Sequence, residues 1–462
     1  MSEDWGHVFN GEASIRYWSP AVGHVLAEQR VTKLRIRGWK HPTLDPLIPF
    51  RDQIVRIFWE VDATDDTPDL AALGQLHRLN HLSLRDRLEQ IDFSGLRELQ
   101  RLSAWADEPS FGNVRQCRSL QVLSITNCGL RDLTPLAGLA HLAELEIGEA
   151  PLKSLAGADA LRGLRRLVLL QLPLATLSGI ESLQQLEVLH IYMLGRLEGI
   201  AALTSLKRLK TISIGAARKI ADLEHLGDIA NLEALDLTGA APSPAILSRL
   251  MRLKRLHLTN AGKLPSLGFL RSMKVLRELW LVEGTTVEDG DMSILLELPA
   301  LTRVHFTNRK RYTHRHEDVQ QTLLARSTTG VGAFDNAMAG TWFETLQVRE
   351  PLSWAGTAIR DALSIPPPKK LPAMNAQYAV ASAELVALLK GRRGRTTHYP
   401  PELTEWLKSH AQQPGSVLVA NAVLALERVV TPPSGLLEVW TDRGQASEWL
   451  VAIDDLKARI VS

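Results

Sequence analysis

The stretch that decides the fold runs from Cys117 to Ser182 and divides into three lines of 22 residues. They are CRSLQVLSITNCGLRDLTPLAG (117–138), LAHLAELEIGEAPLKSLAGADA (139–160) and LRGLRRLVLLQLPLATLSGIES (161–182). Apolar residues occupy the first, fourth, seventh and ninth positions of every line, which in the last line are Leu161, Leu164, Leu167 and Leu169. A unit this short cannot bury an apolar face alone, so the pattern predicts a solenoid of stacked repeats.

The ninth position serves as a marker for following the pattern in both directions along the chain. Successive markers are 20 to 25 residues apart, a spacing inside the range of about 20–29 residues for short repeats of this kind. We therefore predict about 13 repeats over residues 31–309. The markers are Ile36, Trp59, Leu84, Ala104, Ile125, Ile147, Leu169, Ile191, Ile214, Leu237, Leu258, Leu281 and Phe306.

Each unit combines a strand pattern with a return limb of a different period. The seventh and ninth residues point inward from a short strand, and the sixth, eighth and tenth point the other way. On the return limb apolar residues recur every three positions, as in Leu130, Leu133 and Leu136, which suits 3₁₀-like turns. The predicted fold class is an α/β solenoid with a curved parallel sheet on its concave side and 3₁₀-like return limbs.

The 22-residue units resemble the short bacterial leucine-rich repeats found in internalins. The resemblance covers about residues 31–309 and implies a ladder of buried asparagine side chains at the twelfth position. In one repeat of this chain the twelfth position holds Cys128, a residue that the family accepts there. In the next three repeats it holds Ala150, Leu172 and Leu194, which cannot form the ladder. We therefore expect backbone pairing or water to satisfy the polar groups at this place.

The segments that flank the repeats divide the rest of the chain. Residues 1–30 are predicted to form an N-terminal cap containing a hairpin turn at Asn10-Gly11. Residues 310–375 form a basic transition followed by a proline-rich linker, and residues 376–462 form a small, mostly helical C-terminal domain. Helices are expected at Ala376–Lys390, Pro400–Ala411, Val417–Val430 and Ser447–Ile460.

Composition limits the classes of function. The net charge is only +2, which argues against nucleic acid as a partner. No basic and apolar leader and no apolar run of membrane-spanning length is present, so we predict a cytoplasmic protein, or one secreted without a cleavable signal, that does not enter membranes. Both cysteines, Cys117 and Cys128, fall at core positions of the repeat, which does not suit a disulfide framework. The composition does not predict an oligomeric state.

Catalytic motifs are missing from the sequence. It has no glycine-rich phosphate loop, no His-Glu-x-x-His and no Gly-x-Ser-x-Gly. His314 and His316 have no third ligand at useful spacing, so a solvated basic loop is the simpler interpretation. Some bacterial effectors join similar repeats to a helical ubiquitin ligase with a cysteine nucleophile, but no cysteine follows Cys128. We predict no catalytic residue, cofactor or metal.

The outward strand positions form the predicted binding surface, because aromatic and arginine side chains on a rigid sheet dominate interface energies. The sequence therefore predicts a scaffold that binds a protein partner on its concave face. Two alternatives stay open: an effector-like enzyme with a non-thiol activity in residues 310–462, and an immunity or sequestering protein. Glu278 also occupies an outward strand position and is therefore expected to lie on this surface. The candidate binding residues are Phe58, Arg85, Trp105, His190, Tyr192, His257, Trp280 and His305.

Overall fold

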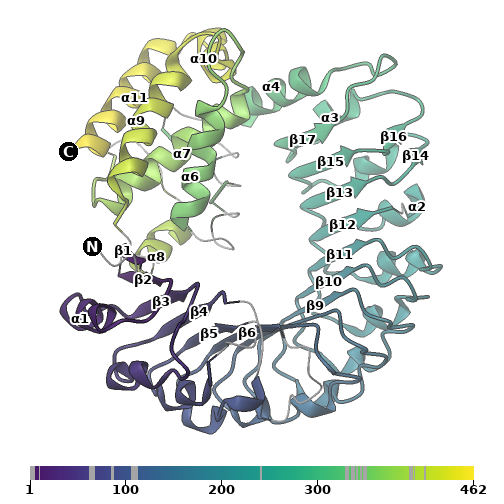
Figure 1. The fold of residues 1–462 in the computed structure, drawn as a ribbon. Helices are drawn as coiled ribbons and strands as arrows, with labels where there is room; N and C mark the ends of the chain where they lie inside the picture. Colours follow the sequence, from purple (N-terminus) through teal and green to yellow (C-terminus); the bar gives the residue numbers. More distant parts are fainter. Residues whose placement is uncertain are drawn as a thin grey trace. The chain divides into compact units, whose positions relative to one another are not determined.

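The computed structural model divides the chain into two compact units (Figure 1). Unit 1 comprises Met1–Leu264 and Gly284–Thr286, and unit 2 comprises Pro265–Glu283 and Val287–Ser462. The residues that the structure describes are 6–9, 11–61, 68–84, 88–105, 113–239, 242–327, 332–334, 339, 342–343, 346, 351–394, 399, 401–409 and 413–462.

Unit 1 is built on a sheet with one strand per repeat, lying on the inner side of a curved stack (Figure 1). From β2 to β13 each strand pairs in parallel with the next one along the chain. The predicted parallel solenoid is confirmed. The strands are β1 (Gly6–Phe9), β2 (Glu12–Ile15), β3 (Lys33–Ile36), β4 (Arg56–Trp59), β5 (His81–Leu84), β6 (Arg101–Trp105), β7 (Val122–Thr126), β8 (Glu144–Gly148), β9 (Arg166–Leu170), β10 (Val188–Tyr192), β11 (Thr211–Gly215), β12 (Ala234–Thr238) and β13 (Arg255–Thr259).

The strand register follows the leucine pattern. Leu145, Leu167 and Leu189 lie side by side on β8, β9 and β10, and none is more than 1% exposed. These are seventh positions, and the ninth positions next to them, such as Leu169, are equally buried. Since a slip of one residue would turn every leucine to the opposite face, the burial of both positions fixes the register along the sheet.

The return limbs of unit 1 are mostly 3₁₀ turns, as their three-residue period predicts. Consecutive turns stack on one another along the solenoid. One limb instead carries a short α-helix, α2 (Pro244–Leu247). The 3₁₀ turns are Asp45–Phe50, Ala71–Gln75, Leu88–Gln90, Phe93–Gly95, Val114–Gln116, Thr134–Leu136, Ala158–Ala160, Ile180–Ser182, Ala201–Ser205 and Leu223–Asp228.

A backbone ladder stands where related repeats use asparagine side chains. The residue after each of several strands, at the eleventh position, adopts a positive φ, and its N–H donates to the tenth-position carbonyl of the next repeat. Examples are Glu149 N to Leu170 O at 3.0 Å and Gln171 N to Tyr192 O at 2.9 Å. The twelfth position is then free to be apolar, and Leu172 and Leu194 are buried there. Backbone pairing, one of the two expected substitutes, therefore supplies the ladder.

This ladder has a conformational cost that can be relieved. Gln171 is exposed and has φ +50°, a conformation that costs an L-residue about 1–2 kcal/mol but costs glycine little. Glycine also has a greater conformational entropy in the unfolded chain, which offsets part of the relieved cost. Gln171→Gly is therefore expected to raise the free energy of unfolding by about 0.5–1 kcal/mol. Urea denaturation measures the change. Gln171→Ala is the matched control, and an equal gain from alanine would show that the backbone conformation is not the cause.

The N-terminal end of unit 1 contains the predicted hairpin. Strands β1 and β2 pair antiparallel on either side of the turn, where Gly11 has φ +75°; Asn10 lies outside the described residues. Helix α1 (Pro20–Glu28) follows. Two ring contacts, Trp18 with Trp39 at 5.2 Å and Trp39 with Trp59 at 6.3 Å, connect this end to the first repeats. The hairpin and α1 thus supply the covering layer that a solenoid end needs.

Unit 2 contains the last repeats, whose strands β15 (Glu278–Val282) and β17 (Arg303–Phe306) pair in parallel. A 3₁₀ turn (Gly268–Ser272) and the short helix α3 (Ile294–Glu297) form their return limbs. Two further short strands form a separate two-stranded sheet: β14 (Lys263–Leu264), which belongs to unit 1, and β16 (Thr286–Val287), of which Thr286 belongs to unit 1 and Val287 to unit 2.

Helix α4 (His316–Ser327) covers the edge of β17. The Gln320 side-chain amide accepts from Val304 N at 2.8 Å and donates to Thr302 O at 2.9 Å, replacing the bonds that a further strand would make. Arg326 donates to the carbonyls of Leu296, Leu298 and Leu301. The unpaired edge of the sheet is therefore satisfied by side chains from one helix.

The C-terminal part of unit 2 is helical, as predicted. Residues of all these helices share one apolar core, which includes Ala355 and Ile359 of α6. Because α6 precedes the proline-rich segment, the helical core includes residues on both sides of it, whereas the predicted helical domain began at residue 376. The limits of the predicted domains otherwise stay a prediction. The helices are α6 (Pro351–Leu363), α7 (Ala373–Leu389), α8 (Pro401–Ser409), α9 (Ser416–Val430), α10 (Gly435–Asp442) and α11 (Ala446–Val461).

Arg428 of α9 attaches the proline-rich segment to this core. It is 7% exposed and donates to the carbonyls of Ile365, Lys369, Thr431 and Pro433. A buried guanidinium without partners would be costly, so these bonds favour a fixed position for the segment. Among the described residues, no helix is both long and apolar enough to pass through a bilayer.

Both cysteines are structural, as predicted. Cys117 and Cys128 are free thiols that are 1% and 4% exposed. Burial raises the pKa of Cys117 to about 11, and it raises the pKa of Cys128 as well. A raised pKa disfavours the thiolate that nucleophilic chemistry requires, and both side chains pack as small apolar groups of the repeat core.

Candidate binding surface on the sheet

The sheet of unit 1 has one face turned away from the repeat core. We call it the concave face, and it carries the sixth, eighth and tenth residues of each strand. Parallel pairing sets equivalent positions of neighbouring repeats side by side, about 4.8 Å apart. His190, Ser213, Asp236 and His257 therefore form one row across β10, β11, β12 and β13.

A group of polar and aromatic side chains gathers around this row. We call it the concave cluster, and it consists of Arg166, His190, Tyr192, Asp236, Arg255 and His257. Within it, Arg166 Nη1 lies 3.0 Å from His190 Nε2, and His257 Nδ1 lies 2.9 Å from Asp236 Oδ1. Arg255 Nε is 3.7 Å from the same carboxylate oxygen. Four strands thus contribute to one connected surface.

The surroundings set the charge of two members of the cluster. Burial lowers the pKa of His190, and the charge of Arg166 lowers it further, so the imidazole is neutral and accepts from the guanidinium. Burial would raise the pKa of Asp236, but the hydrogen bond and charge of His257, together with Arg255, hold it below the ordinary value. Asp236 is therefore a carboxylate shared by two neighbouring side chains.

Tyr192 is the most exposed aromatic residue of this cluster, with 49% of its surface accessible. Its ring lies on Gly215 of the next strand, where an added Cβ would be 2.6 Å from Tyr192 Cδ2. On the other side, the strand register places it beside Leu170. Because residue 215 has no side chain, the Tyr192 ring packs directly on the sheet at this place. We call this contact with Gly215 the seat of the ring.

A second aromatic site lies near the N-terminal end of unit 1. Phe58 is half-buried, with the Arg35 guanidinium 5.0 Å from its ring centroid and the His81 ring at 5.0 Å. Arg35 also pairs with Glu12 at 2.7 Å and with Glu60. Burial, with the charges of Arg56 and Arg101, lowers the pKa of His81 to about 4. Phe58 is thus enclosed by its neighbours, whereas Tyr192 is open.

The other two candidates near this end cannot be placed. Arg85 lies outside the described residues, and so does the side chain of Trp105, although the backbone of Trp105 pairs with Thr126 in the sheet. Their assignment to the binding surface stays a prediction.

In unit 2 the structure brings Trp280 and His305 together, with ring centroids 5.8 Å apart. Trp280 is 39% exposed. Glu278, on the same strand, differs from expectation: it is only 5% exposed, although it points outward from the sheet. It pairs with Arg303, which in turn contacts the Tyr378 hydroxyl of α7. A helix distant in sequence covers this position, which strand periodicity cannot reveal.

Three members of the concave cluster, Arg166, Asp236 and Arg255, were not among the predicted binding residues. All three occupy outward positions, and Asp236 stands at the same repeat position as His190 and His257. Reading the eighth position across successive repeats, as well as along each strand, would have identified it. Among the described residues, no group of three or more His, Cys, Asp or Glu side chains is arranged to hold a metal ion.

The order of the strands and the burial of the leucine positions decide the class of the molecule. This chain has the fold of a leucine-rich-repeat solenoid. A family model described as a domain of unknown function (DUF4259) matches residues 327–452, which lie in the helical part of this leucine-rich-repeat protein. No curated protein sequence matches the chain.

The repeat protein is similar in structure to several solved bacterial proteins. The internalin InlF of Listeria monocytogenes has a TM-score of 0.47 and 19% identity, covering 61% of this chain and 83% of that one. Internalin C2 of the same organism has 0.36 and 22%, covering 42% and 83%. A leucine-rich-repeat protein of Leptospira interrogans has 0.43 and 20%, covering 68% and 92%.

Proposed function

We propose that this leucine-rich-repeat protein is an interaction scaffold that binds a protein partner through the concave cluster. The observation that supports this most strongly is Tyr192, an aromatic side chain that is half exposed yet held on Gly215. Tyrosine, tryptophan and arginine are the residues that most often dominate protein interfaces. An exposed tyrosine in a fixed position has the properties of such an anchor.

The neighbours of Tyr192 match the mixed chemistry of a protein interface. Leu170 on β9, which is half-buried, supplies apolar surface beside the ring, and Arg166, Asp236 and His257 supply charged and hydrogen-bonding groups around it. An apolar centre with a polar border is the usual arrangement in such interfaces. The surface carries both signs of charge, which suits a protein better than a polyanion.

The sheet also lowers the entropic cost of binding. Tyr192 lies in the middle of the parallel sheet, with β9 on one side of its strand and β11 on the other. Since the backbone is fixed before the partner arrives and the ring is already seated, few degrees of freedom are lost on association. Most of the contact energy is therefore available as affinity.

Tyr192→Ala is expected to weaken binding of the partner at least about tenfold, because it removes a central aromatic anchor. The experiment captures partners from an extract of the producing cells with the full chain, purifies the retained protein, and measures its affinity by titration. Met251→Ala is the matched control, because Met251 is 63% exposed and lies outside the strands. Both variants should melt near the wild-type temperature.

A second variant tests the seat of the ring without removing it. Gly215→Ala places a methyl group where the Tyr192 ring lies, so the ring must move, and affinity should fall although the tyrosine is still present. The proposal is wrong if Tyr192→Ala and Gly215→Ala both bind as tightly as Met251→Ala.

Other expectations drawn from the sequence are unaffected by this proposal. The contribution of Trp280 and His305, the cytoplasmic location and the absence of a cofactor stay predictions. The two alternatives, an enzymatic activity in residues 310–462 and a sequestering role, would appear as turnover or as capture of a small molecule by the full chain.

A further inference from the structure

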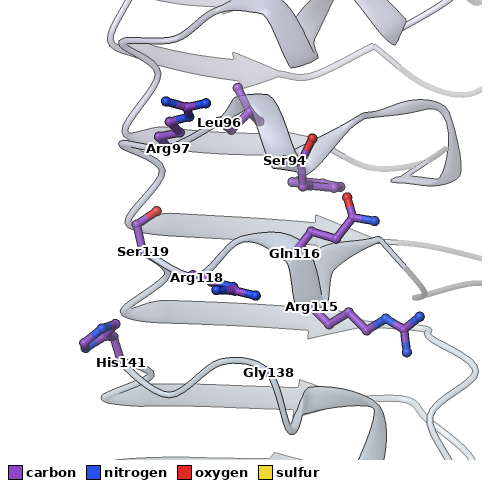
Figure 2. Close-up of a pocket in the computed structure, with 10 residues that line it drawn as sticks. Ser94, Leu96, Arg97, Arg115, Gln116, Arg118, Ser119, Gly138 and His141 are labelled. Carbon is purple, nitrogen blue, oxygen red and sulfur yellow. The ribbon is translucent and has the colours of Figure 1, made fainter.

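The return limbs of unit 1 contain a hollow of about 800 Å³ (Figure 2). It extends over three consecutive limbs, from the turn at Phe93–Gly95 to His141, and its lining residues belong to the limbs and not to the outward strand positions of the concave cluster. Its size is typical of small-molecule sites, which measure roughly 300–1,000 Å³.

The lining of this hollow is basic and rich in hydrogen-bond donors. Figure 2 shows Arg97, Ser119 and His141 along one side, Ser94, Gln116 and Arg115 along the other, and Arg118 between them. Arg97 and Arg118 hold the same repeat position, 21 residues apart, so they belong to neighbouring repeats. Gly138 contributes no side chain, and a Cβ there would meet the Arg115 carbonyl oxygen at 2.8 Å.

Among the described residues, no carboxylate lines the hollow, and none lies within ion-pair distance of Arg97, Arg115 or Arg118. Some exposed cations elsewhere in unit 1 do have a carboxylate partner. Lys210 pairs with Glu187 at 2.9 Å and Lys254 with Glu233 at 2.8 Å, each on the neighbouring repeat. The three arginines of the hollow therefore leave a local positive charge that the described side chains do not neutralise.

We infer that this hollow binds a small soluble anion carrying two or more phosphate groups. Guanidinium groups present planar, paired N–H donors that match phosphate oxygens, and Arg97, Arg115 and Arg118 supply three such groups. Three cations around one open hollow favour a ligand with several closely spaced negative charges.

A small ligand fits this surface better than a nucleic acid. Nucleic acids require a positive track that follows their backbone. Here the charge is confined to one hollow, the net charge of the chain is only +2, and the adjacent Arg78 already pairs with Glu98 at 3.3 Å. At this neighbour the positive charge is already neutralised, so Arg78 does not extend the charge of the hollow along the limbs.

The test measures binding of pyrophosphate to the full chain by isothermal titration calorimetry at low ionic strength. Wild type should bind pyrophosphate more tightly than inorganic phosphate, and added salt should weaken binding. The double variant Arg97→Gln/Arg118→Gln should bind at least about tenfold more weakly, because it keeps polar side chains but loses two guanidinium groups. Arg162→Gln is the matched control, since Arg162 has the same repeat position but donates to its own turn at Asp159 O.

Both altered arginines are exposed, so the double variant should keep the wild-type melting temperature, which circular dichroism verifies. The inference is overturned if wild type fails to bind pyrophosphate at millimolar concentration, or if the double variant binds as well as Arg162→Gln. It is also overturned if a single-stranded oligonucleotide binds while pyrophosphate does not. Pyrophosphate binding to the hollow does not involve Tyr192, so this experiment neither requires nor tests the proposed partner surface.

Discussion

Leu167→Ala is expected to lower the free energy of unfolding by about 2–5 kcal/mol. Leu167 is fully buried on β9, between Leu145 and Leu189 of the adjacent strands. Alanine removes apolar contacts and leaves a cavity that a stack of regular repeats cannot easily close, because each repeat is held in position by its two neighbours. Urea denaturation followed by circular dichroism measures the loss.

The matched control for this change is on the same strand. Leu170 is three residues further on, on the concave face, and only half-buried. Leu170→Ala should therefore cost clearly less stability than Leu167→Ala. If the two substitutions cost the same, the seventh position is not the buried one, and the register of the repeat is wrong.

Glu384→Gln is expected to destabilise the helical part of unit 2 by about 3–5 kcal/mol. Glu384 of α7 is 1% exposed, and its two carboxylate oxygens accept from Arg459 of α11 at 2.7 and 2.8 Å. The Tyr399 hydroxyl donates to the same carboxylate at 2.6 Å. Glutamine keeps the shape but removes the buried one of the two carboxylates that Arg459 pairs with, and the largely exposed Asp455, 2.7 Å from Arg459 Nε, only partly compensates the guanidinium charge.

A surface ion pair provides the comparison. Glu405 and Lys408 of α8 form a pair at 2.6 Å, but both side chains are largely exposed, so Glu405→Gln should cost less than about 1 kcal/mol. Thermal and urea unfolding of the full chain, monitored by helical circular dichroism, compares the two variants. Equal costs would mean that Glu384 and Arg459 are not held together in the folded protein.

Wild type and the Glu384→Gln variant should also differ in how Tyr399 titrates. Burial raises the pKa of Tyr399, and the negative charge of Glu384 and the hydrogen bond to it raise the pKa further. With a neutral glutamine at residue 384, the electrostatic part of this effect is lost, and the pKa of the phenol should fall towards its ordinary value. Because unfolding would also lower this pKa, the titration is read together with the helical circular dichroism signal, which stays at the wild-type level if only the ion pair is lost.

The repeat fold was predictable from the sequence because its determinants are local. Each repeat carries its own buried leucines, and the period of two along the strand decides which face every residue occupies. Leu167 and Leu169 therefore point inward and His190 and Tyr192 outward, whatever the rest of the chain does. The three-residue period of the return limbs similarly determined their 3₁₀ turns.

Which outward residues are open to a partner was decided only by the tertiary structure. Glu278 and Tyr192 have equivalent outward orientations, yet Glu278 is 5% exposed and Tyr192 49%. The difference comes from Tyr378, which contacts Arg303 across 75 residues of sequence and belongs to a helix whose packing no repeat pattern encodes. In the same way, the seat of the Tyr192 ring depends on Gly215 of another repeat. The face of the sheet to which a side chain points is determined by the local chain. The exposure of that side chain depends on which residues pack against it, and those residues are far away in the sequence.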